Sequence, residues 1–245
     1  MEPYAILPAT EEEVEAVHAG LRAYNRNYCP DAEDLSRAVG RLFPRDTGSG
    51  YGELLTNERQ AQAASRALEA VDRGELSLGD ELTASRAAMT TGLAEDGSTA
   101  NIKEGEVMTV EEYLYCMLVV SANEACNVLA EAVSGSVTEF VARMNARAAE
   151  LGMTGTHFSN THGYHDDDHY TTAYDIYRMC RQAMEFETFR TIVSAKNYTM
   201  PATNFHPEER IVRSTNALIS NFRVAGYIYE YATGIKTGHT PEAGY

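Results

Sequence analysis

The feature that most constrains the fold of this sequence is a pair of helix patterns separated by a polar triplet. Thr109-Val-Glu-Glu112 has the spacing of a capping box, and the apolar run EEYLYCMLVV follows it. Ser121-Ala-Asn123 interrupts that run, and a second helix pattern continues to Ser134-Gly135, where glycine can end a helix. The sequence therefore predicts two helices that meet at a polar junction. A serine or asparagine at such a junction is usually a helix cap, so the triplet alone identifies no site.

Further helix and strand patterns surround this pair. Apolar residues recur at helical spacing in residues 10–26, 60–72, 137–151 and 173–184, and Thr171 or Thr172 can cap the last of these. Short β-branched or aromatic runs bounded by Pro, Asn or Gly predict strands at 196–200, 209–213 and 226–238. Helices in the middle and strands near the end predict a helical region packed on a sheet.

Charge and hydropathy exclude two classes of partner. The chain has 245 residues and a formal net charge of −16, which would repel phosphate backbones and anionic lipid. No run approaches the roughly 20 apolar residues of a membrane span, and the first residues, MEPYAILPATEEEVEAV, lack the basic and apolar regions of an export signal. We therefore expect no nucleic acid partner, no membrane span and no signal peptide in this chain.

Two short motifs far apart in the sequence carry a family resemblance. Ser121-Ala-Asn123 lies between two helices and Lys236-Thr237-Gly238 lies on a predicted late strand. This order and setting resemble the serine-type D-alanyl-D-alanine carboxypeptidases, which belong to the penicillin-binding and β-lactamase-like transpeptidase family. The intervening phrases MNARAAELGMTGTHFSNTHG, YTTAYDIYRM and RSTNAL follow in family order. The resemblance covers about residues 70–245.

The resemblance implies a fold and a division of the chain. The expected fold is α/β (α+β): an antiparallel sheet flanked by helices in three layers, with an all-helical insert carrying the Ser-Ala-Asn triplet. Residues 1–45 do not resemble the family and are expected to form a separate helical segment, with the carboxypeptidase-like domain at 46–245. Family members continue beyond the Lys-Thr-Gly strand, so the sheet is expected to be incomplete on that side.

The resemblance also assigns roles to the motif residues. Ser121 would relay a proton, Asn123 would hold the substrate amide, and Lys236 with Thr237 and Gly238 would bind the terminal carboxylate of the substrate. The family's nucleophile and base form a Ser-x-x-Lys motif on one helix face, and this chain contains none. Ser65 is the candidate counterpart of the nucleophile if a turn of the helix is missing. An ungapped match places Asn57 and Gln60 there instead.

Metal chemistry is a weaker reading of the sequence. The four cysteines are widely spaced and form no Cys-x-x-Cys pair, so we expect buried free thiols. His157, His162, His165 and His169 lie within thirteen positions together with three aspartates, a composition that could bind zinc or iron. A solvated polar loop before the next helix explains this cluster more simply. No cofactor or metal is expected.

Three functions remain open from the sequence. The first is a D-alanyl-D-alanine carboxypeptidase acting on peptidoglycan pentapeptides and β-lactams through a serine acyl-enzyme, with catalysis in question because Ser-x-x-Lys is absent. The second is a non-catalytic pseudoenzyme that binds D-Ala-D-Ala peptides. The third is a metal-dependent hydrolase that uses the His-Asp loop. The family works outside the cytoplasmic membrane, and without an export signal the compartment of this chain stays open.

Overall fold

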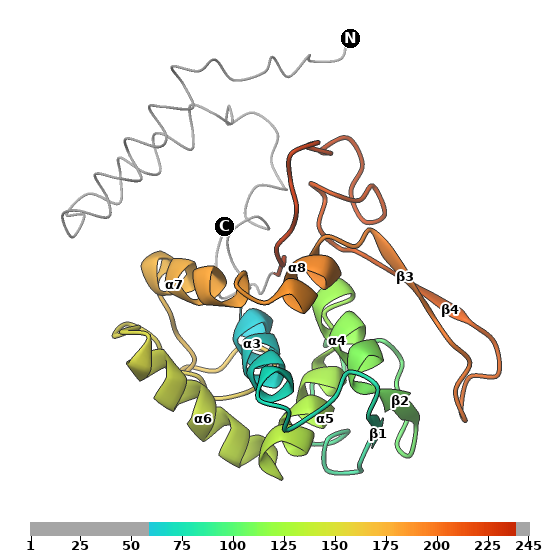
Figure 1. Cartoon of the computed structure of the whole chain (residues 1–245), viewed down its shortest axis with the longest axis horizontal. Helices are drawn as coiled ribbons and strands as arrows, with labels where there is room; N and C mark the ends of the chain where they lie inside the picture. The colour runs from blue at the N-terminus through green and yellow to red at the C-terminus, as the bar shows by residue number, and fades with distance from the viewer. Residues whose placement is uncertain (1–58, 239–245) are drawn as a thin grey trace, which may run out of the picture. The chain divides into compact units, whose positions relative to one another are not determined.

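A computed structural model of the protein describes residues 59–238. Within that range the chain forms the helices α3 (Arg59–Asp72), α4 (Val110–Val119), α5 (Asn123–Ser134), α6 (Val137–Glu150), α7 (Ala173–Ala183) and α8 (Glu187–Val193). Helix α3 lies in the middle of the bundle and contacts each of the other five helices (Figure 1). The helix patterns at 60–72, 137–151 and 173–184 are confirmed. The prediction at 10–26 and the proposed boundary between residues 45 and 46 lie outside the described residues.

The predicted helix pair is confirmed in detail. The Thr109 hydroxyl accepts from the Glu112 amide at 3.2 Å and the Glu112 carboxylate accepts from the Thr109 amide at 2.7 Å, which completes the capping box. Gly135 ends α5 at φ 76°, a left-handed conformation that glycine adopts without strain. Tyr113, Leu114 and other large side chains of α4 are completely buried, so this helix is covered by other elements on nearly every side.

The strands form two separate antiparallel pairs in the described part of the chain. Strands β1 (Glu81–Thr83) and β2 (Val107–Thr109) make one pair, and β3 (Asn197–Met200) and β4 (Arg210–Arg213) make the other. The predicted strands at 196–200 and 209–213 are therefore confirmed. Sequence patterns missed β1, β2 and the seven-residue helix α8 because elements this short show no periodicity.

The predicted strand at 226–238 is wrong. Its residues form no ladder with another strand of the described chain, although its β-branched and aromatic residues have strand propensity. Propensity does not make a strand without a partner backbone to exchange hydrogen bonds with. Within residues 59–238 the strands form two small antiparallel sheets, where the resemblance implied one sheet flanked by helices.

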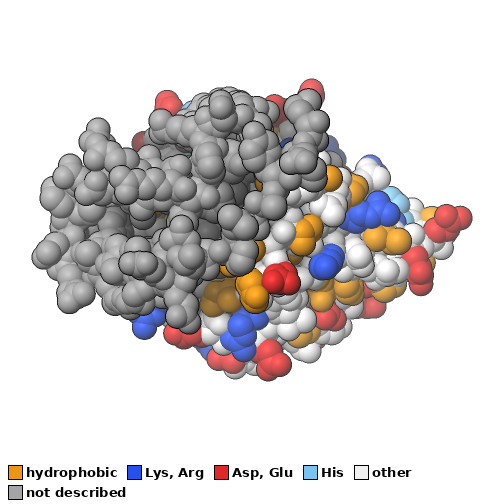
Figure 2. Space-filling view, turned by 90° about the horizontal axis from the view of Figure 1, so that it is seen from above, with side chains coloured by type: hydrophobic (Ala, Val, Ile, Leu, Met, Phe, Trp, Pro, Cys, Tyr) orange, Lys and Arg blue, Asp and Glu red, His pale blue; other side chains and the backbone are white. Residues whose placement is uncertain are grey.

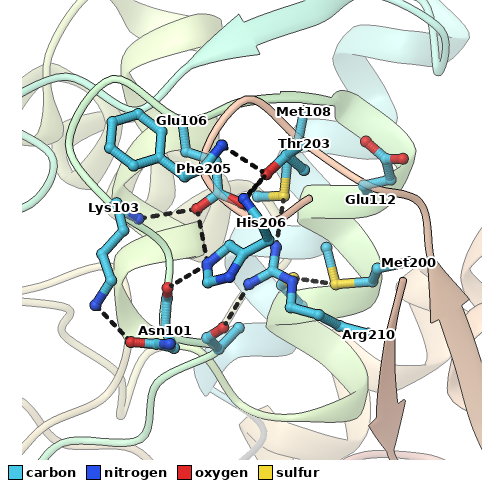
Figure 3. Close-up of polar contacts among 12 residues, drawn as sticks. Asn101, Lys103, Glu106, Met108, Glu112, Met200, Thr203, Phe205, His206 and Arg210 are labelled. Atoms are coloured by element: carbon cyan, nitrogen blue, oxygen red, sulfur yellow. Dashed lines mark hydrogen bonds and ion pairs between the residues drawn. The ribbon is translucent and has the colours of Figure 1, made fainter. Parts of the chain in front are cut away.

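A buried carboxylate fastens the β3–β4 hairpin to the segment before β2. Glu106 is completely buried and accepts from the Arg210 guanidinium at 2.7 Å, from the Thr203 hydroxyl at 2.8 Å and from the Lys103 amide at 3.0 Å (Figure 3). Because removing a buried ion from water is costly, its partners must be held in place. The stacked rings of Tyr115 and Tyr198, with centroids 3.7 Å apart, add a second attachment between α4 and β3. These contacts attach the β3–β4 hairpin to α4 and to the segment before β2.

The cysteine prediction is confirmed for the three cysteines that the structure describes. Cys116, Cys126 and Cys180 are buried and free. Burial raises the pKa of the Cys116 and Cys126 thiols well above their usual range, which keeps both thiols neutral and unreactive.

Candidate functional site

The Ser-Ala-Asn triplet forms a sharp corner between α4 and α5. Ser121 has φ 68°, a left-handed conformation that is uncommon for a residue with a Cβ. Asn123 begins α5 and is 7% exposed, and its backbone N–H donates to the carbonyl of Ser98 at 2.9 Å. A Cβ at Gly97 would lie 2.8 Å from Asn123 Nδ2 and 3.0 Å from the Ala94 carbonyl, so a larger residue there would force its neighbours to shift. The hydrogen bond to Ser98 and the close approach to Gly97 therefore hold the start of α5 in place.

Lys236 reaches this corner from the far end of the described chain. Its ammonium donates to the Ser121 hydroxyl and to the Thr237 carbonyl. The side chain is buried, with 6% of the residue exposed. Burial, with a smaller contribution from the positive charge of Arg223, lowers the pKa of Lys236 to about 8. Among the described residues no aspartate or glutamate forms an ion pair with Lys236, so the site is electropositive.

Threonine hydroxyls lie beside the lysine. The Oγ1 atoms of Thr237 and Thr215 are 2.9 Å apart, and the Thr215 amide donates to the carbonyl of Val119 at 3.3 Å. Thr215 follows β4, so the hairpin brings it to the end of α4. Ser121, Thr215, Thr237 and Gly238 are all partly exposed, which makes the cluster accessible to a ligand. Thr215 belongs to the phrase RSTNAL that carries part of the family resemblance, although the motif pattern predicted no role for it.

The structure places Ser65 away from solvent. It is the seventh residue of α3, counted from Arg59, and is 2% exposed beside the buried Ala63 and Ala64. A nucleophile needs an accessible hydroxyl and, in the resembled motif, a position at the helix start. Gln60, from the ungapped match, lies in the first turn of α3, and Asn57 lies outside the described residues. The structure thus brings Ser121, Lys236 and Thr237 together, while the nucleophile role of Ser65 stays a prediction that its burial opposes.

The His-Asp loop is organised by its own polar contacts. His157 Nδ1 lies 2.6 Å from the carbonyl of Asp168, and the Ser159 hydroxyl donates to Asp166 at 3.0 Å. The ring of His169 packs edge-on against Phe158. Within residues 59–238 no group of three or more His, Cys, Asp or Glu side chains is placed to hold a metal ion. The described geometry therefore gives the metal-dependent hydrolase no ligand set.

The described surface and helices bear on the expectations about charge and membrane span. On the described part of the face in Figure 2, basic side chains are interspersed with acidic and hydrophobic ones. None of the described helices is long and apolar enough to span a bilayer.

Comparison with known proteins decides the family. A family model described as D-alanyl-D-alanine carboxypeptidase matches residues 64–245. The chain belongs to this family. The D-alanyl-D-alanine carboxypeptidase DacF of Bacillus subtilis (strain 168) is 33% identical over 222 residues, which cover 87% of this chain and 53% of the relative. The D-alanyl-D-alanine carboxypeptidase of Streptomyces sp. (strain K15) is 31% identical over 223 residues, covering 85% of this chain and 74% of the relative.

Solved structures of D-alanyl-D-alanine peptidases share the fold. A single-residue variant of the Streptomyces K15 DD-transpeptidase superposes with a TM-score of 0.66 at 27% identity, over 77% of this chain and 72% of that chain. The Mycobacterium tuberculosis H37Rv D-alanyl-D-alanine carboxypeptidase gives a TM-score of 0.61 at 29% identity, over 77% and 65%. The family and the transpeptidase-like fold expected from the motifs are confirmed. The chain spans about half the length of the Bacillus relative.

Proposed function

We propose that this carboxypeptidase-family chain binds peptidoglycan peptides that end in D-alanine, and related β-lactams, at the cluster formed by Ser121, Lys236, Thr237 and Thr215. The Ser-x-x-Lys chemistry of the resembled family is not part of this function, because the chain has no such motif. The cell-wall face of the membrane is the compartment in which such a ligand is available.

The observation that carries the proposal is a buried cation that has no carboxylate partner among residues 59–238. Lys236 is 6% exposed, and its described hydrogen bonds go to a neutral hydroxyl and a backbone carbonyl. Burying a charge without an opposite charge is unfavourable, and an anion that enters the site reduces this cost. The terminal carboxylate of a peptide is such an anion, and charge-assisted hydrogen bonds hold carboxylates well. Of the Thr215 and Thr237 hydroxyls, which are hydrogen-bonded to each other, the one that does not donate to its partner can add a neutral donor.

The carboxypeptidase reaction through Ser65 is less well supported. Ser65 is buried on α3, and the residue three positions later is Leu68, which cannot act as a base. Loss of a catalytic nucleophile in one studied serine hydrolase lowers the rate by about 10⁶-fold. Binding without this chemistry is therefore the function that the described geometry favours.

Titration calorimetry tests the proposal with two peptides. One ends in D-Ala-D-Ala with a free carboxylate, and the other is the same peptide with a C-terminal amide. We expect saturable binding of the acid and at least a tenfold weaker affinity for the amide, because the amide offers no charge to Lys236. Equal affinity for both peptides would contradict carboxylate recognition, and no binding of either by folded protein would reject the proposed function.

A further inference from the structure

We infer that Ser121 is itself a nucleophile activated by Lys236, so that the helix corner can be acylated by a β-lactam in the absence of Ser-x-x-Lys. This inference rests on the proposed function, because the ligand must first bind at the same cluster. It assigns the corner serine a bond-forming role in place of the proton relay that the resemblance implied.

The position of Ser121 is that of an exposed, constrained nucleophile. It has φ 68° at the corner between α4 and α5, and its side chain is partly exposed. Residues held in sparsely populated backbone regions occur preferentially at functional sites, where the surrounding structure enforces them. The nucleophilic serine of α/β-hydrolases likewise lies on a strained turn that leads into a helix. Ser65 has neither property, because it lies inside α3 and is buried.

A base lies within hydrogen-bond reach of the Ser121 hydroxyl. Lys236 Nζ is hydrogen-bonded to Ser121 Oγ, and a lysine that accepts the proton of a serine needs this contact. The charged and titratable groups that act on Lys236 are the Cys126 thiol on α5 and the Arg223 guanidinium in the segment after β4. Burial and Arg223 lower the pKa of Lys236 to about 8, so roughly a tenth of the lysine is a neutral amine at about pH 7.

The acylation step balances with these two residues. The neutral amine of Lys236 takes the Ser121 hydroxyl proton while Oγ forms a bond to the lactam carbonyl carbon. The carbon–nitrogen bond of the ring breaks, its electron pair stays on nitrogen, and Lys236 delivers the proton to that nitrogen. When Lys236 is neutral, the drug's carboxylate can still contact the Thr215 and Thr237 hydroxyls. Because the opened ring stays attached, the product has the mass of the protein plus one whole penicillin.

Intact-protein mass spectrometry after incubation with benzylpenicillin tests the inference on the full chain. We expect one penicillin added to the wild type, mapped by peptide digestion to Ser121. The adduct should be lost in Ser121→Gly, in which glycine tolerates the left-handed corner, and in Lys236→Met. Ser65→Ala should keep it, which makes this variant the matched control. Between about pH 6 and about pH 8 the rate should rise about fiftyfold in total, with a smaller rise per unit above about pH 7, as the lysine loses its proton.

Three results would overturn the inference. They are an adduct that maps to another residue, an adduct that survives Ser121→Gly, and no adduct on protein whose circular dichroism shows it to be folded. Calorimetry with the D-Ala-D-Ala peptide separates the two claims in the last case. Retained peptide binding would leave the proposed function standing while the nucleophile is rejected, and absent binding would reject both.

Discussion

The ammonium of Lys236 donates a hydrogen bond to the hydroxyl of Ser121, 115 positions earlier in the chain. This contact joins the two motifs that the sequence shows only as separate triplets. It also makes the protonation state of one lysine decisive for the site, because the ammonium attracts a carboxylate and the amine can accept a proton from serine.

Replacing Lys236 by methionine should weaken binding of the D-Ala-D-Ala peptide roughly ten- to a hundredfold. A charge-assisted hydrogen bond contributes about 1.5–3 kcal/mol, and methionine keeps the buried stem while removing the charge. Calorimetry measures the change. Lys196→Met, at an exposed lysine, is the matched control and should leave affinity unaltered. Comparable losses in both variants would show that general electrostatics, and no specific contact, governs binding.

Affinity for the same peptide should fall as the pH rises through about 8. Lys236 is protonated below its pKa of about 8, so the ion pair is fully available there and disappears as the ammonium loses its proton above it. The bound carboxylate raises the pKa of the lysine in the complex, so the decline begins near the pKa of the free protein and continues up to the pKa in the complex, with a limit of about tenfold per pH unit. Dissociation constants at about pH 6.5 and about pH 9.5 provide the measurement. The C-terminal amide peptide should show a flat profile, and a flat profile for the acid would contradict the prediction.

Acid should destabilise the fold partly through His162. Burial lowers the pKa of this ring from 6.5 to about 4, so the folded state holds it neutral. Between those values the unfolded chain binds a proton that the folded chain does not, and stability falls as the pH falls through that window, by at most about 1.4 kcal/mol per unit. Urea unfolding of wild type and His162→Asn should show a shallower pH dependence in the variant. His165→Asn, at an exposed ring, should keep the wild-type slope.

Glu106→Gln should destabilise the protein by about 3 kcal/mol. The substitution leaves the partly buried Arg210 guanidinium without its counter-charge, and breaking one side of a buried ion pair costs about 3–5 kcal/mol. Chemical denaturation gives the free energy of unfolding. Glu104→Gln changes an exposed carboxylate two positions away and should stay within about 0.5 kcal/mol of the wild type. A Glu106 variant as stable as the Glu104 variant would show that the network does not fasten the hairpin.

Gly97→Ala should weaken both the fold and the site. The added methyl group would lie 2.8 Å from Asn123 Nδ2 and 3.0 Å from the Ala94 carbonyl, so the corner must shift, at a cost of about 1–3 kcal/mol. Peptide affinity should decrease in parallel as Asn123 moves. At Gly79 a methyl group would meet nothing within 4 Å, so Gly79→Ala is the control and should be neutral or slightly stabilising. Equal melting temperatures for the two variants would refute the close contact.

The sequence by itself determined the local elements of this protein and its family. The capping box at Thr109, the glycine that ends α5 and the strands at 196–200 and 209–213 follow from side-chain and backbone preferences of neighbouring residues, which act at short range. The two triplets and the phrases between them gave the family for the same reason, because motifs are strings of adjacent residues.

Only the tertiary structure decided which of these residues meet. It paired Lys236 with Ser121, added Thr215 to the cluster and buried Ser65 inside α3. It also left residues 226–238 without a ladder to any other described strand, despite their strand propensity. Pairing across a hundred positions depends on how helices and hairpins pack, and a strand depends on the backbone beside it. Both are long-range properties that short-range preferences do not specify.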